Sequence, residues 1–307
     1  MDPIVSVSYD FKNESEARDF IMSCEEKFFG QVDLAADRVL ASGKKFIALS
    51  GPTCSGKTTA SDRICSEIVS RGYRVKVISV DDFYLSRRVL EERAKANGTH
   101  IDFDSPTTID NDYLAECVDR LREGKVAELP HYGFVSGERE GYTAFDGKDA
   151  DFYLVEGIQA IYPSVLDILH RDQVVSLFIR PSTSLAAGGE IFESHEQRFA
   201  RRLVRDFRDR GAPPEYTFYL WEGVRQNEKI HIEPYEHTVD FRIDSTMAYE
   251  PCVIRSRYIS YLEKVPHDSP YRAKAELFIK EYDSIPSISS TLVPDHSIFR
   301  EFVGKRQ

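Results

Sequence analysis

Cysteine is scarce in this chain of 307 residues: there are five cysteines, an odd number, and no two of them form a C-x-x-C pair. Their scarcity argues against a disulfide framework and against a zinc site, and it is typical of a reducing compartment. Apolar runs of about 18 residues, the length that spans a bilayer, are absent, and so is a basic-then-apolar pattern at the N-terminus. We therefore expect a cytoplasmic protein with no membrane partner.

Basic residues are outnumbered by acidic ones, 40 against 51, which gives a net charge of −11. A field of this sign repels duplex DNA and anionic membranes unless a local patch overrides it, so nucleic acid is not expected as a partner. Apolar material is ample, with 41% hydrophobic residues, 19 Phe and 16 Tyr. The length permits one large domain or two small ones.

One motif stands out from this background. Residues 51–58 match the phosphate-loop pattern G-x-x-x-x-G-K-[ST], between an apolar run that predicts a strand and a segment with helical spacing. Its glycines let backbone N–H groups point at phosphate oxygens, and the helix N-terminus adds partial positive charge. Lys57 is expected at the β- and γ-phosphates and the Thr58 hydroxyl on Mg²⁺. The predicted ATP-binding residues here are Gly51, Pro52, Thr53, Cys54, Ser55, Gly56, Lys57, Thr58 and Thr59.

Strand-like and helix-like segments alternate after residue 43. The strands expected are 46–49, 75–80, 152–155 and 174–179, and the helices are 58–71 and 112–121. Such alternation predicts an α/β fold, a mostly parallel sheet covered by helices on both faces. In such sheets ligands bind outside the carboxyl ends of the strands.

The chain is expected to have three parts. Residues 1–42 form an N-terminal helical extension with two helices, the first capped by Ser15. Residues 43–245 form the nucleotide-binding domain. Residues 246–307 form a C-terminal helical extension, in which we expect helices at 248–262 and 271–282 and a tail whose residues 298–302 dock on the core.

Carboxylates follow two of the predicted strands. Asp81 and Asp82 come directly after one strand, and Glu156 ends another. Phosphoryl transfer needs a carboxylate near the acceptor hydroxyl and ligands for a metal ion. One aspartate is expected to accept a hydrogen bond from that hydroxyl, and Glu156, a costly charge unless paired, to hold Mg²⁺. The alternatives are a helix cap or solvated loop for the aspartates and a surface turn for Glu156.

Arginine is concentrated in residues 198–210, which hold six arginines in thirteen positions. Four of them share one face of the predicted helix: Arg198, Arg201, Arg202 and Arg205. Because guanidinium groups match phosphate oxygens, we interpret this helix as a lid over the phosphates, approached through the flexible Gly188-Gly189 pair. The alternative is a salt-bridged helix that uses Asp206 and Asp209, and for Arg208 this alternative is preferred.

Further motifs occur in the order found in uridine kinases. They are SVDDFY at 79–84, FDSP at 103–106, LPHYGF at 129–134, VEGI at 155–158 and RRLVRD at 201–206. Over about residues 45–245 the chain resembles the phosphoribulokinase/uridine kinase group of P-loop kinases. Its residues 294–304 also resemble the end of bacterial uridine kinase-like proteins that often carry a TGS domain, which is not evident here. The resemblance implies a P-loop NTPase fold, a kinase domain at 43–245 and a lid around 181–212.

The resemblance also implies roles for individual residues. Asp81 takes the role of the catalytic carboxylate, assisted by Lys57, Arg202 and Arg205, and Arg201 joins the ATP-binding residues. The implied magnesium ligands are Thr58, Asp81 and Glu156. The implied substrate-binding residues are Asp82, Tyr84, Phe103, Asp104, Tyr132, Phe134, Arg202 and Arg210. Asp104 is expected on the ribose hydroxyls, and the four aromatic rings would stack around a planar base, although rings of this size are more often core residues.

Three positions depart from the uridine kinase pattern. Gly137 stands where a histidine reads the pyrimidine edge, Ala212 replaces an arginine near the nucleoside, and Leu220 replaces a base-contacting glutamine. Discrimination of this type depends on paired polar contacts, so the identity of the base is left open.

Together these observations predict an ATP-dependent, Mg²⁺-requiring kinase for a primary hydroxyl of a small molecule, the 5′-hydroxyl of a nucleoside in the first instance. One alternative is a non-nucleoside acceptor such as a sugar phosphate or glycerate. Another is a nucleotide-sensing module without catalysis. The resemblance also implies self-association into a homo-oligomer.

Overall fold

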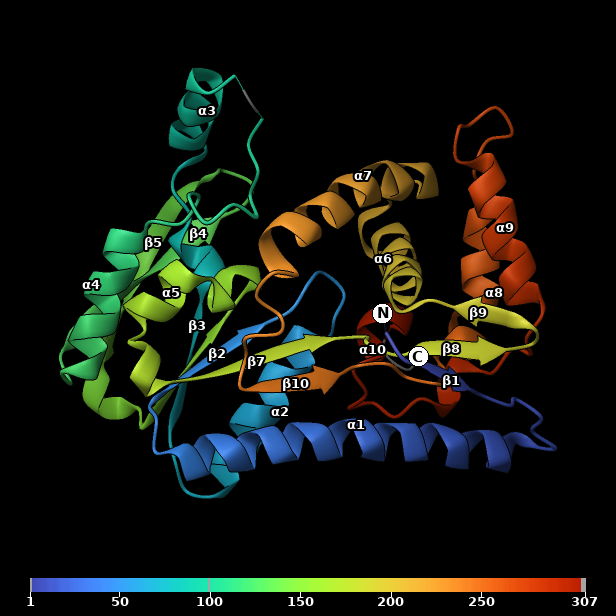
Figure 1. Cartoon of the computed structure of the whole chain (residues 1–307), viewed down its shortest axis with the longest axis horizontal. Helices are drawn as coiled ribbons and strands as arrows, with labels where there is room; N and C mark the ends of the chain where they lie inside the picture. The colour runs from blue at the N-terminus through green and yellow to red at the C-terminus, as the bar shows by residue number, and fades with distance from the viewer. Residues whose placement is uncertain (1, 99, 305–307) are drawn as a thin grey trace.

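The computed structural model describes residues 2–98 and 100–304, and a five-stranded sheet lies at its centre (Figure 1). Every pair of neighbouring strands is parallel, in the order β10-β7-β2-β6-β3. The strands are β2 (Phe46–Ser50), β3 (Val75–Ser79), β6 (Phe152–Glu156), β7 (Val174–Arg180) and β10 (Phe241–Asp244). The predicted α/β fold is confirmed, with the strand before the phosphate loop in the middle of the sheet.

Helices cover both faces of this sheet. Ile47 and Leu49 of β2 belong to one core with helices α1 and α2, whereas Phe46 and Ala48 belong to a second core with α4 and α5. The bounds are α1 (Glu14–Ser42), α2 (Lys57–Ser70), α4 (Asn111–Arg122) and α5 (Pro163–Ile168). Burial on both faces explains why β2 is a continuous apolar run in the sequence rather than an alternating one.

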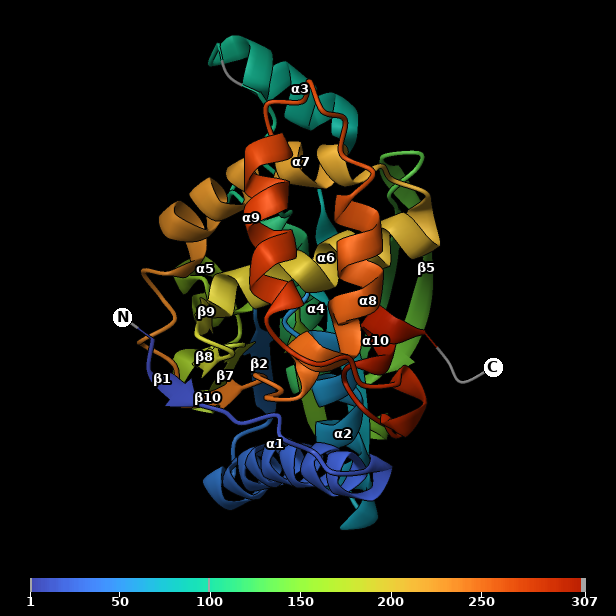
Figure 2. The same ribbon diagram turned by 90° about the vertical axis from the view of Figure 1, so that its right-hand side faces the viewer.

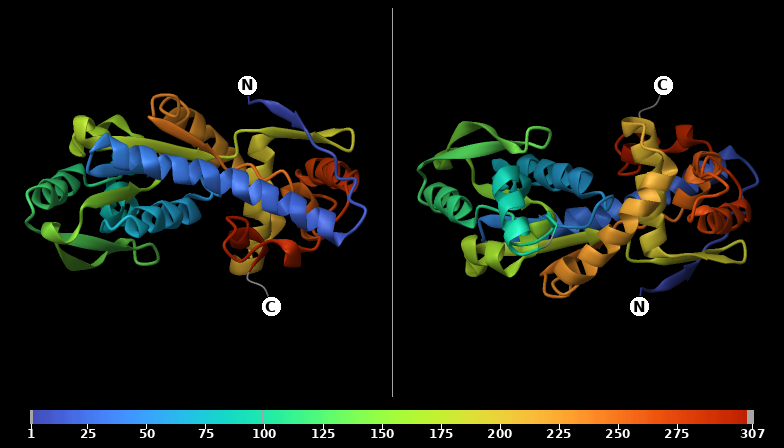
Figure 3. Two further views of the ribbon diagram at one scale, coloured as in Figure 1. Left: turned by 90° about the horizontal axis from the view of Figure 1, so that it is seen from below. Right: turned by 90° about the horizontal axis from the view of Figure 1, so that it is seen from above.

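The N-terminal part differs from the prediction of two helices. One helix, α1, runs along the underside of the molecule (Figure 3), and it begins after Asn13, whose side chain accepts a hydrogen bond from the Glu16 N–H, rather than at Ser15. Gly30 does not interrupt it, because Phe28 and Val32 on either side are buried in the core and tertiary packing overrides propensity. Before it, β1 (Ile4–Ser6) pairs with β8 (Ser184–Ala187).

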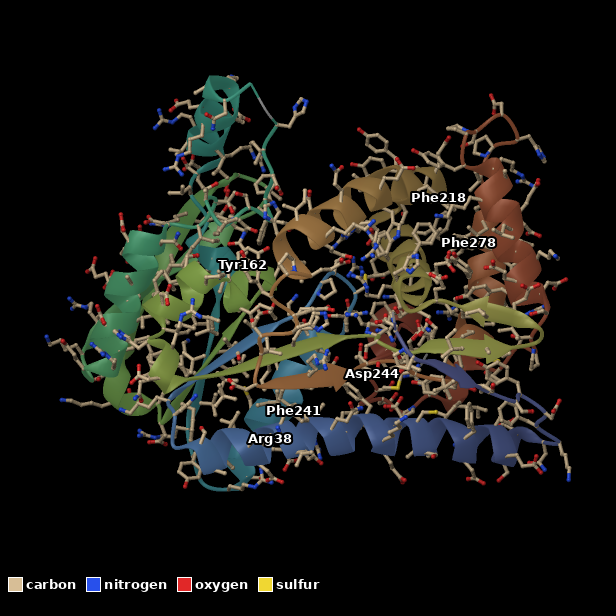
Figure 4. The ribbon with its side chains drawn as sticks, in the orientation of Figure 1. Arg38, Tyr162, Phe218, Phe241, Asp244 and Phe278 are labelled. Atoms are coloured by element: carbon tan, nitrogen blue, oxygen red, sulfur yellow. The ribbon has the colours of Figure 1, made fainter. Side chains whose placement is uncertain are left out.

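The C-terminal half forms a layer of helices at one end of the sheet (Figure 2). These are α6 (Ser194–Arg210), α7 (Pro214–Asn227), α8 (Glu250–Leu262) and α9 (Arg272–Asp283). Phe199 of α6 lies at their centre, with ring centroids 4.6 Å from Phe218 of α7 and 5.5 Å from Phe278 of α9 (Figure 4). The two helices predicted beyond residue 246 are confirmed as α8 and α9.

Smaller elements complete the fold, and none of them was predicted. They are the hairpin β4 (Val126–Gly133) with β5 (Glu138–Asp146), the hairpin β8 with β9 (Glu190–Phe192), α3 (Arg87–Ala96) and α10 (Arg300–Val303). The β4–β5 strands escaped the sequence reasoning because β5 is largely exposed and carries no apolar alternation.

The tail docks as expected, since Ile298, Phe299 and Phe302 are fully buried. One core cluster contains Phe28 of α1, Leu177 of β7 and Phe302 of α10, so all three parts of the chain share it. Arg38 of α1 contacts β10 from below: its guanidinium carbon lies 4.6 Å from the centroid of the Phe241 ring (Figure 4). Within residues 2–98 and 100–304, no helix has the length and apolar character that crossing a bilayer requires.

Candidate active site

The phosphate loop has the expected context, between β2 and the first residue of α2, Lys57. Gly56 forms the N-cap of α2 with φ of 90°, and Cys54 also has a positive φ of 59°. At Gly51 an added Cβ would lie 2.2 Å from the carbonyl oxygen of Ile179, so only glycine allows this close approach of β7 to the loop.

The loop has polar groups that suit phosphate. The Ser55 hydroxyl oxygen is buried and has no hydrogen-bond partner within the described part of the chain. Lys57 folds over the loop, with its Nζ donating to the Gly51 carbonyl at 3.0 Å. A buried group without a partner is unusual in a folded protein, and a phosphate oxygen in the loop would satisfy it.

The register of the sheet brings the acidic residues to the same edge. Glu156 of β6 lies opposite Leu49 of β2 on one side and opposite Ser79 of β3 on the other. Asp81 follows Ser79 by two residues, and an added Cβ at Gly157 would lie 3.6 Å from its Oδ1. The carboxyl ends of β2, β3 and β6 therefore place the phosphate loop, Asp81 and Glu156 around one point.

Electrostatics shows the same proximity. Burial raises the pKa of Asp81 to about 6, and the charges of Glu156, Asp82 and Asp104 act in the same direction, whereas Lys57 opposes them. Desolvation and like charges both disfavour an ionised carboxylate. Asp81 thus lies among acidic residues and beside Lys57.

The oxygen atoms at this edge fit a magnesium ion. Neither Asp81 nor Glu156 forms an ion pair among residues 2–98 and 100–304, and the Thr58 hydroxyl is at the start of the adjacent helix. No group of three or more His, Cys, Asp or Glu side chains that could hold a metal occurs in the same part of the chain. Mg²⁺ is commonly held by one or two carboxylates together with substrate phosphates, so such a group is not required.

An aromatic cluster lies beside Asp81. Tyr84 is at its centre, with ring centroids 5.9 Å from Phe103, 5.5 Å from Tyr132 and 6.3 Å from Phe134. Phe103 and Phe134 are 41% and 61% exposed, unlike core rings. The four aromatics named from the resemblance therefore form one partly open wall.

Asp82 connects this wall to the strand end. Its Oδ1 accepts a hydrogen bond of 3.1 Å from the backbone N–H of Tyr132 in β4. This contact orients the β4–β5 hairpin against the turn that carries Asp81. A direct contact of Asp82 with the acceptor stays a prediction.

Asp104 lies on a loop that contacts the end of α7. The Asn227 amide donates to Asp104 Oδ2 at 3.1 Å and to Asp102 Oδ1 at 3.0 Å, and a ring nitrogen of His231 lies 2.7 Å from Asp102 Oδ2. Burial raises the pKa of Asp104. Asn227 and His231 were missed by the sequence reasoning, because they lie more than a hundred residues beyond the loop they support.

Gln159 and Tyr162, which follow β6, also contact the loop that carries Asp104. Gln159 donates to the carbonyl of Phe103 at 2.8 Å, and its Oε1 is buried without a hydrogen-bond partner in the described residues. The Tyr162 hydroxyl donates to the Asp104 carbonyl at 2.9 Å, and Figure 4 shows this ring above the sheet. Gln159 and Tyr162 were not predicted as site residues, although they closely follow the VEGI motif.

Gly137 leaves space for a cation. An added Cβ at Gly137 would lie 2.7 Å from the Arg87 Cβ and 2.9 Å from its Nε, and the Arg87 guanidinium donates to the Phe134 carbonyl at 2.7 Å. Arg87 is close enough to Tyr132 to lower the pKa of that phenol, although burial raises it overall. At the position where a histidine was expected, the pocket wall thus carries Arg87 instead.

The prediction of an arginine lid is wrong for Arg198 and Arg201. Both side chains are at most 2% exposed, Arg198 paired with Glu228 and Arg201 with Glu250, each at 2.6 Å. Arg201 also donates to the carbonyls of Ser245 and Cys54, so most of its donors are used inside the protein. Arg198 donates to the Thr53 carbonyl at 3.2 Å. The two arginines therefore support the phosphate loop from outside, and Gly188-Gly189 forms the β8–β9 turn.

The other arginines of α6 are partly exposed. Arg202, Arg205 and Arg210 all lie within 3.3 Å of Asp206, so their predicted contacts with phosphates and substrate stay predictions. Arg205 also lies close to Cys54 of the loop. The preference for a structural role is confirmed for Arg208, which pairs with Asp209 and donates to the Phe302 carbonyl at 2.7 Å.

Comparison with known proteins identifies relatives of this chain. Residues 46–249 match the model of the phosphoribulokinase/uridine kinase family. The chain is 32% identical over 201 residues to a uridine kinase of Staphylococcus aureus, covering 64% of this chain and 86% of that protein. It is 29% identical over 226 residues to the inorganic pyrophosphatase TTM2 of Arabidopsis thaliana, covering 72% of this chain but only 29% of that protein. A phosphoribulokinase structure from Rhodobacter spheroides aligns with a TM-score of 0.45 at 14% identity, over 66% of this chain and 70% of that one.

The family match spans about two thirds of the chain, so the chain belongs to the phosphoribulokinase/uridine kinase family. Members of this family are kinases that phosphorylate alcohols. The matched part includes the phosphate loop, both acidic strand ends and α6, and it excludes α1 and most of the C-terminal part.

Proposed function

We propose that this family member is an ATP- and Mg²⁺-dependent kinase that transfers the γ-phosphoryl group to the primary hydroxyl of a small molecule, with the 5′-hydroxyl of a nucleoside as the first candidate. The observation that supports this most is the position of Asp81, near both Lys57 and Glu156 at the strand edge and close to the aromatic wall around Tyr84.

Each group at this edge has a task in the proposed reaction. Asp81 accepts a hydrogen bond from the acceptor hydroxyl and takes its proton as the new oxygen–phosphorus bond forms, while the bond from the γ-phosphorus to the β–γ bridging oxygen breaks and ADP leaves. Lys57 and the Ser55 hydroxyl hold phosphate oxygens, and Arg202 and Arg205 of α6 offer further positive charge. Mg²⁺, held by Thr58, Glu156 and Asp81, would neutralise charge on the phosphates.

A nucleoside suits the adjacent pocket. Phe103 and Phe134 are exposed, so a planar base can stack on them, and Asp104, which accepts a hydrogen bond from Asn227, is close enough to Asp81 to raise its pKa. A carboxylate there can accept hydrogen bonds from ribose hydroxyls.

Arg87 favours a second candidate, an acceptor that bears a carboxylate or phosphate. Its guanidinium lies over Gly137 and against the wall residue Tyr132. Guanidinium groups bind such anions in bidentate geometry. A sugar phosphate or glycerate would use this charge, whereas uridine would not.

An acceptor panel separates these candidates. ADP formation from Mg·ATP is measured with nucleosides, sugar phosphates, glycerate and neutral sugars, each against a no-acceptor background. The proposal expects at least one acceptor to raise ADP formation at least tenfold. No stimulation by any acceptor, with ATP still bound, would instead support a nucleotide-sensing module.

A pair of adjacent arginines provides a matched control for the acceptor. Arg87→Ala is expected to raise KM for an anionic acceptor more than tenfold, because a charge-assisted contact is lost, and to leave KM for a nucleoside unchanged. Arg88→Ala, which removes a 76% exposed side chain one residue away, is expected to change neither. Equal KM values for the anion in both variants would exclude Arg87 from the pocket.

A further inference from the structure

A second cavity lies outside the acceptor pocket, beside the first turns of α2. It has a volume of about 950 Å³, and its lining includes Thr58, Thr59 and Asp62 of α2, Phe29 of α1, and His296 and Glu301 of the C-terminal tail. A cavity of this size is typical of small-molecule sites. It begins at the residues that follow Lys57, so it is continuous with the phosphate loop.

The tail is held firmly against the loop at this place. An added Cβ on Gly56 would lie 1.8 Å from Ile298 Cδ1, which means that Ile298 covers the N-cap of α2. Glu301 pairs with Arg205 at 3.2 Å, and the buried Ser297 hydroxyl contacts the Tyr249 hydroxyl at 3.1 Å. The tail residues that line the cavity, 295–297, 300 and 301, therefore form one of its walls, and the contacts of Ser297 and Glu301 hold this wall in place.

Flat side chains line part of the cavity. The rings of Phe29 and His296 have centroids 5.3 Å apart, and the Arg63 guanidinium carbon lies 5.4 Å from the centroid of Phe29. Aromatic and guanidinium groups stack on nucleobases of any sequence. The carboxylates of Asp62 and Glu301 would repel phosphates but can accept hydrogen bonds from hydroxyl and amino groups.

The direction of a bound triphosphate follows from the loop. Lys57 and Asp81 mark the end where the γ-phosphate meets the acceptor, and the backbone of the loop cradles the phosphates nearer the base. The base must leave the loop on the side away from Asp81. No residue of the aromatic wall around Tyr84 lines this cavity, whereas Thr58 and Thr59, at the end of the loop, do.

We propose that this cavity binds the base and ribose of the nucleoside triphosphate, with Phe29 and His296 in contact with the base and the tail as one wall. The inference rests on the proposed function for the identity of the ligand as ATP. Both residues lie outside the part of the chain that matches the family, residues 46–249. The base site is therefore a feature that α1 and the tail add to the kinase fold.

Calorimetric binding of two probes, Mg·ATP and magnesium tripolyphosphate, tests the proposal. His296→Ala and Phe29→Ala are each expected to weaken ATP binding about tenfold, the scale of one lost stacking contact. Tripolyphosphate has no base, so its affinity should be unchanged in both variants. His296→Phe keeps a flat ring and is expected to retain the wild-type affinity for ATP.

His267→Ala is the matched control, since it removes an exposed histidine from the connection between α8 and α9. Unchanged ATP affinity in both cavity variants, equal weakening of both probes, or wild-type protein that binds ATP no better than tripolyphosphate would each overturn the base site. ATP binding that depends on His296 without turnover of any acceptor would contradict the proposed function alone.

Discussion

At the scale of single residues, Asp81 has the most demanding position. Burial and neighbouring acids raise its pKa to about 6 against the opposing effect of Lys57. A protonated carboxyl cannot take the proton of an acceptor hydroxyl, so the charged form that catalysis needs is the form that burial disfavours.

This conflict predicts the pH dependence of turnover. In wild-type protein kcat/KM, which reports ionisations of the free enzyme, should fall about tenfold between pH 7 and pH 5, as Asp81 gains its proton. Asp81→Asn should lower kcat by about 10²- to 10⁴-fold at pH 8, with little change in ATP affinity, and its residual activity should lose this acidic limb. Asp268→Asn, an exposed aspartate between α8 and α9, is the control. An Asp81→Asn variant with wild-type turnover would remove Asp81 from its role.

Asp81 also predicts an effect on stability. Because its folded pKa, about 6, lies above the reference value of 3.8, the folded protein binds this proton more tightly than the unfolded chain. The stabilisation is complete below the unfolded pKa and is lost as pH rises through the folded pKa. At pH 8 Asp81→Asn should therefore unfold at higher denaturant, by at most about 3 kcal/mol, and near pH 4 the difference should vanish. A variant less stable than wild type at pH 8 would contradict the raised pKa.

Sequence reasoning located the acids because a charge at the end of an apolar strand is conspicuous. It could not distinguish Arg201 from Arg202, which are adjacent and chemically identical. Arg202 pairs with Asp206 one turn along the same helix, whereas the partner of Arg201, Glu250, is distant in the sequence and is brought to it only by the fold. The start of the apolar run after Glu250 was an available indication that this glutamate is buried.

At the scale of elements, α6 braces the phosphate loop rather than closing over it. Arg198 and Arg201 each donate to a loop carbonyl and are neutralised by a buried glutamate. Although burial raises the pKa of Glu228, Arg198 and Arg225 hold it below its usual value, so this pair stays ionised. The helix thereby fixes the shape of the loop before nucleotide binds.

Removing one partner of such a pair is expected to be costly. Glu250→Gln should destabilise the fold by about 3–5 kcal/mol, because it leaves the Arg201 charge buried without a counter-charge. Glu276→Gln, which breaks the exposed pair with Arg272, should cost under about 1 kcal/mol. Both are measured by denaturant unfolding at pH 7. Similar decreases in the free energy of unfolding of the two variants would show that the buried pair stabilises the fold no more than the exposed one.

The elements were predicted where the apolar pattern was strong. β2, β6, β7, α2 and α4 appear within about two residues of their expected bounds, the usual uncertainty of helix ends. β1, β8 and β9 are short strands of a separate three-stranded sheet, and their pairing is visible only in three dimensions. Two helices were expected within residues 1–42, but the structure has the single helix α1. Its continuity depends on packing against the core rather than on local propensity.

At the scale of the whole molecule, the expected division into three parts does not divide the core. Phe28 of α1, Phe199 of α6 and Phe302 of α10 belong to the same cluster of buried residues. Each buried phenylalanine contributes about 1.5–3 kcal/mol relative to exposure. Neither extension can be removed without exposing part of that core.

A fragment of residues 43–245 is therefore expected not to fold cooperatively. Its thermal unfolding should lack the single sharp transition of the full chain, because α1, α8, α9 and the tail complete its core. Differential scanning calorimetry of both proteins measures this. A fragment that melts in one transition at the temperature of the full chain would show that the kinase domain is independent.

The central claim is that a phosphate loop and two acidic strand ends form one site for Mg·ATP and an alcohol. A crystal structure with Mg²⁺ and a non-hydrolysable ATP analogue tests it most directly. We expect the metal at about 2.1 Å from the Thr58 hydroxyl oxygen, with Glu156 on the metal directly or through water, and the Asp81 carboxylate open to the γ-phosphate. An analogue bound with its γ-phosphate and metal remote from Asp81 and Glu156 would contradict the claim.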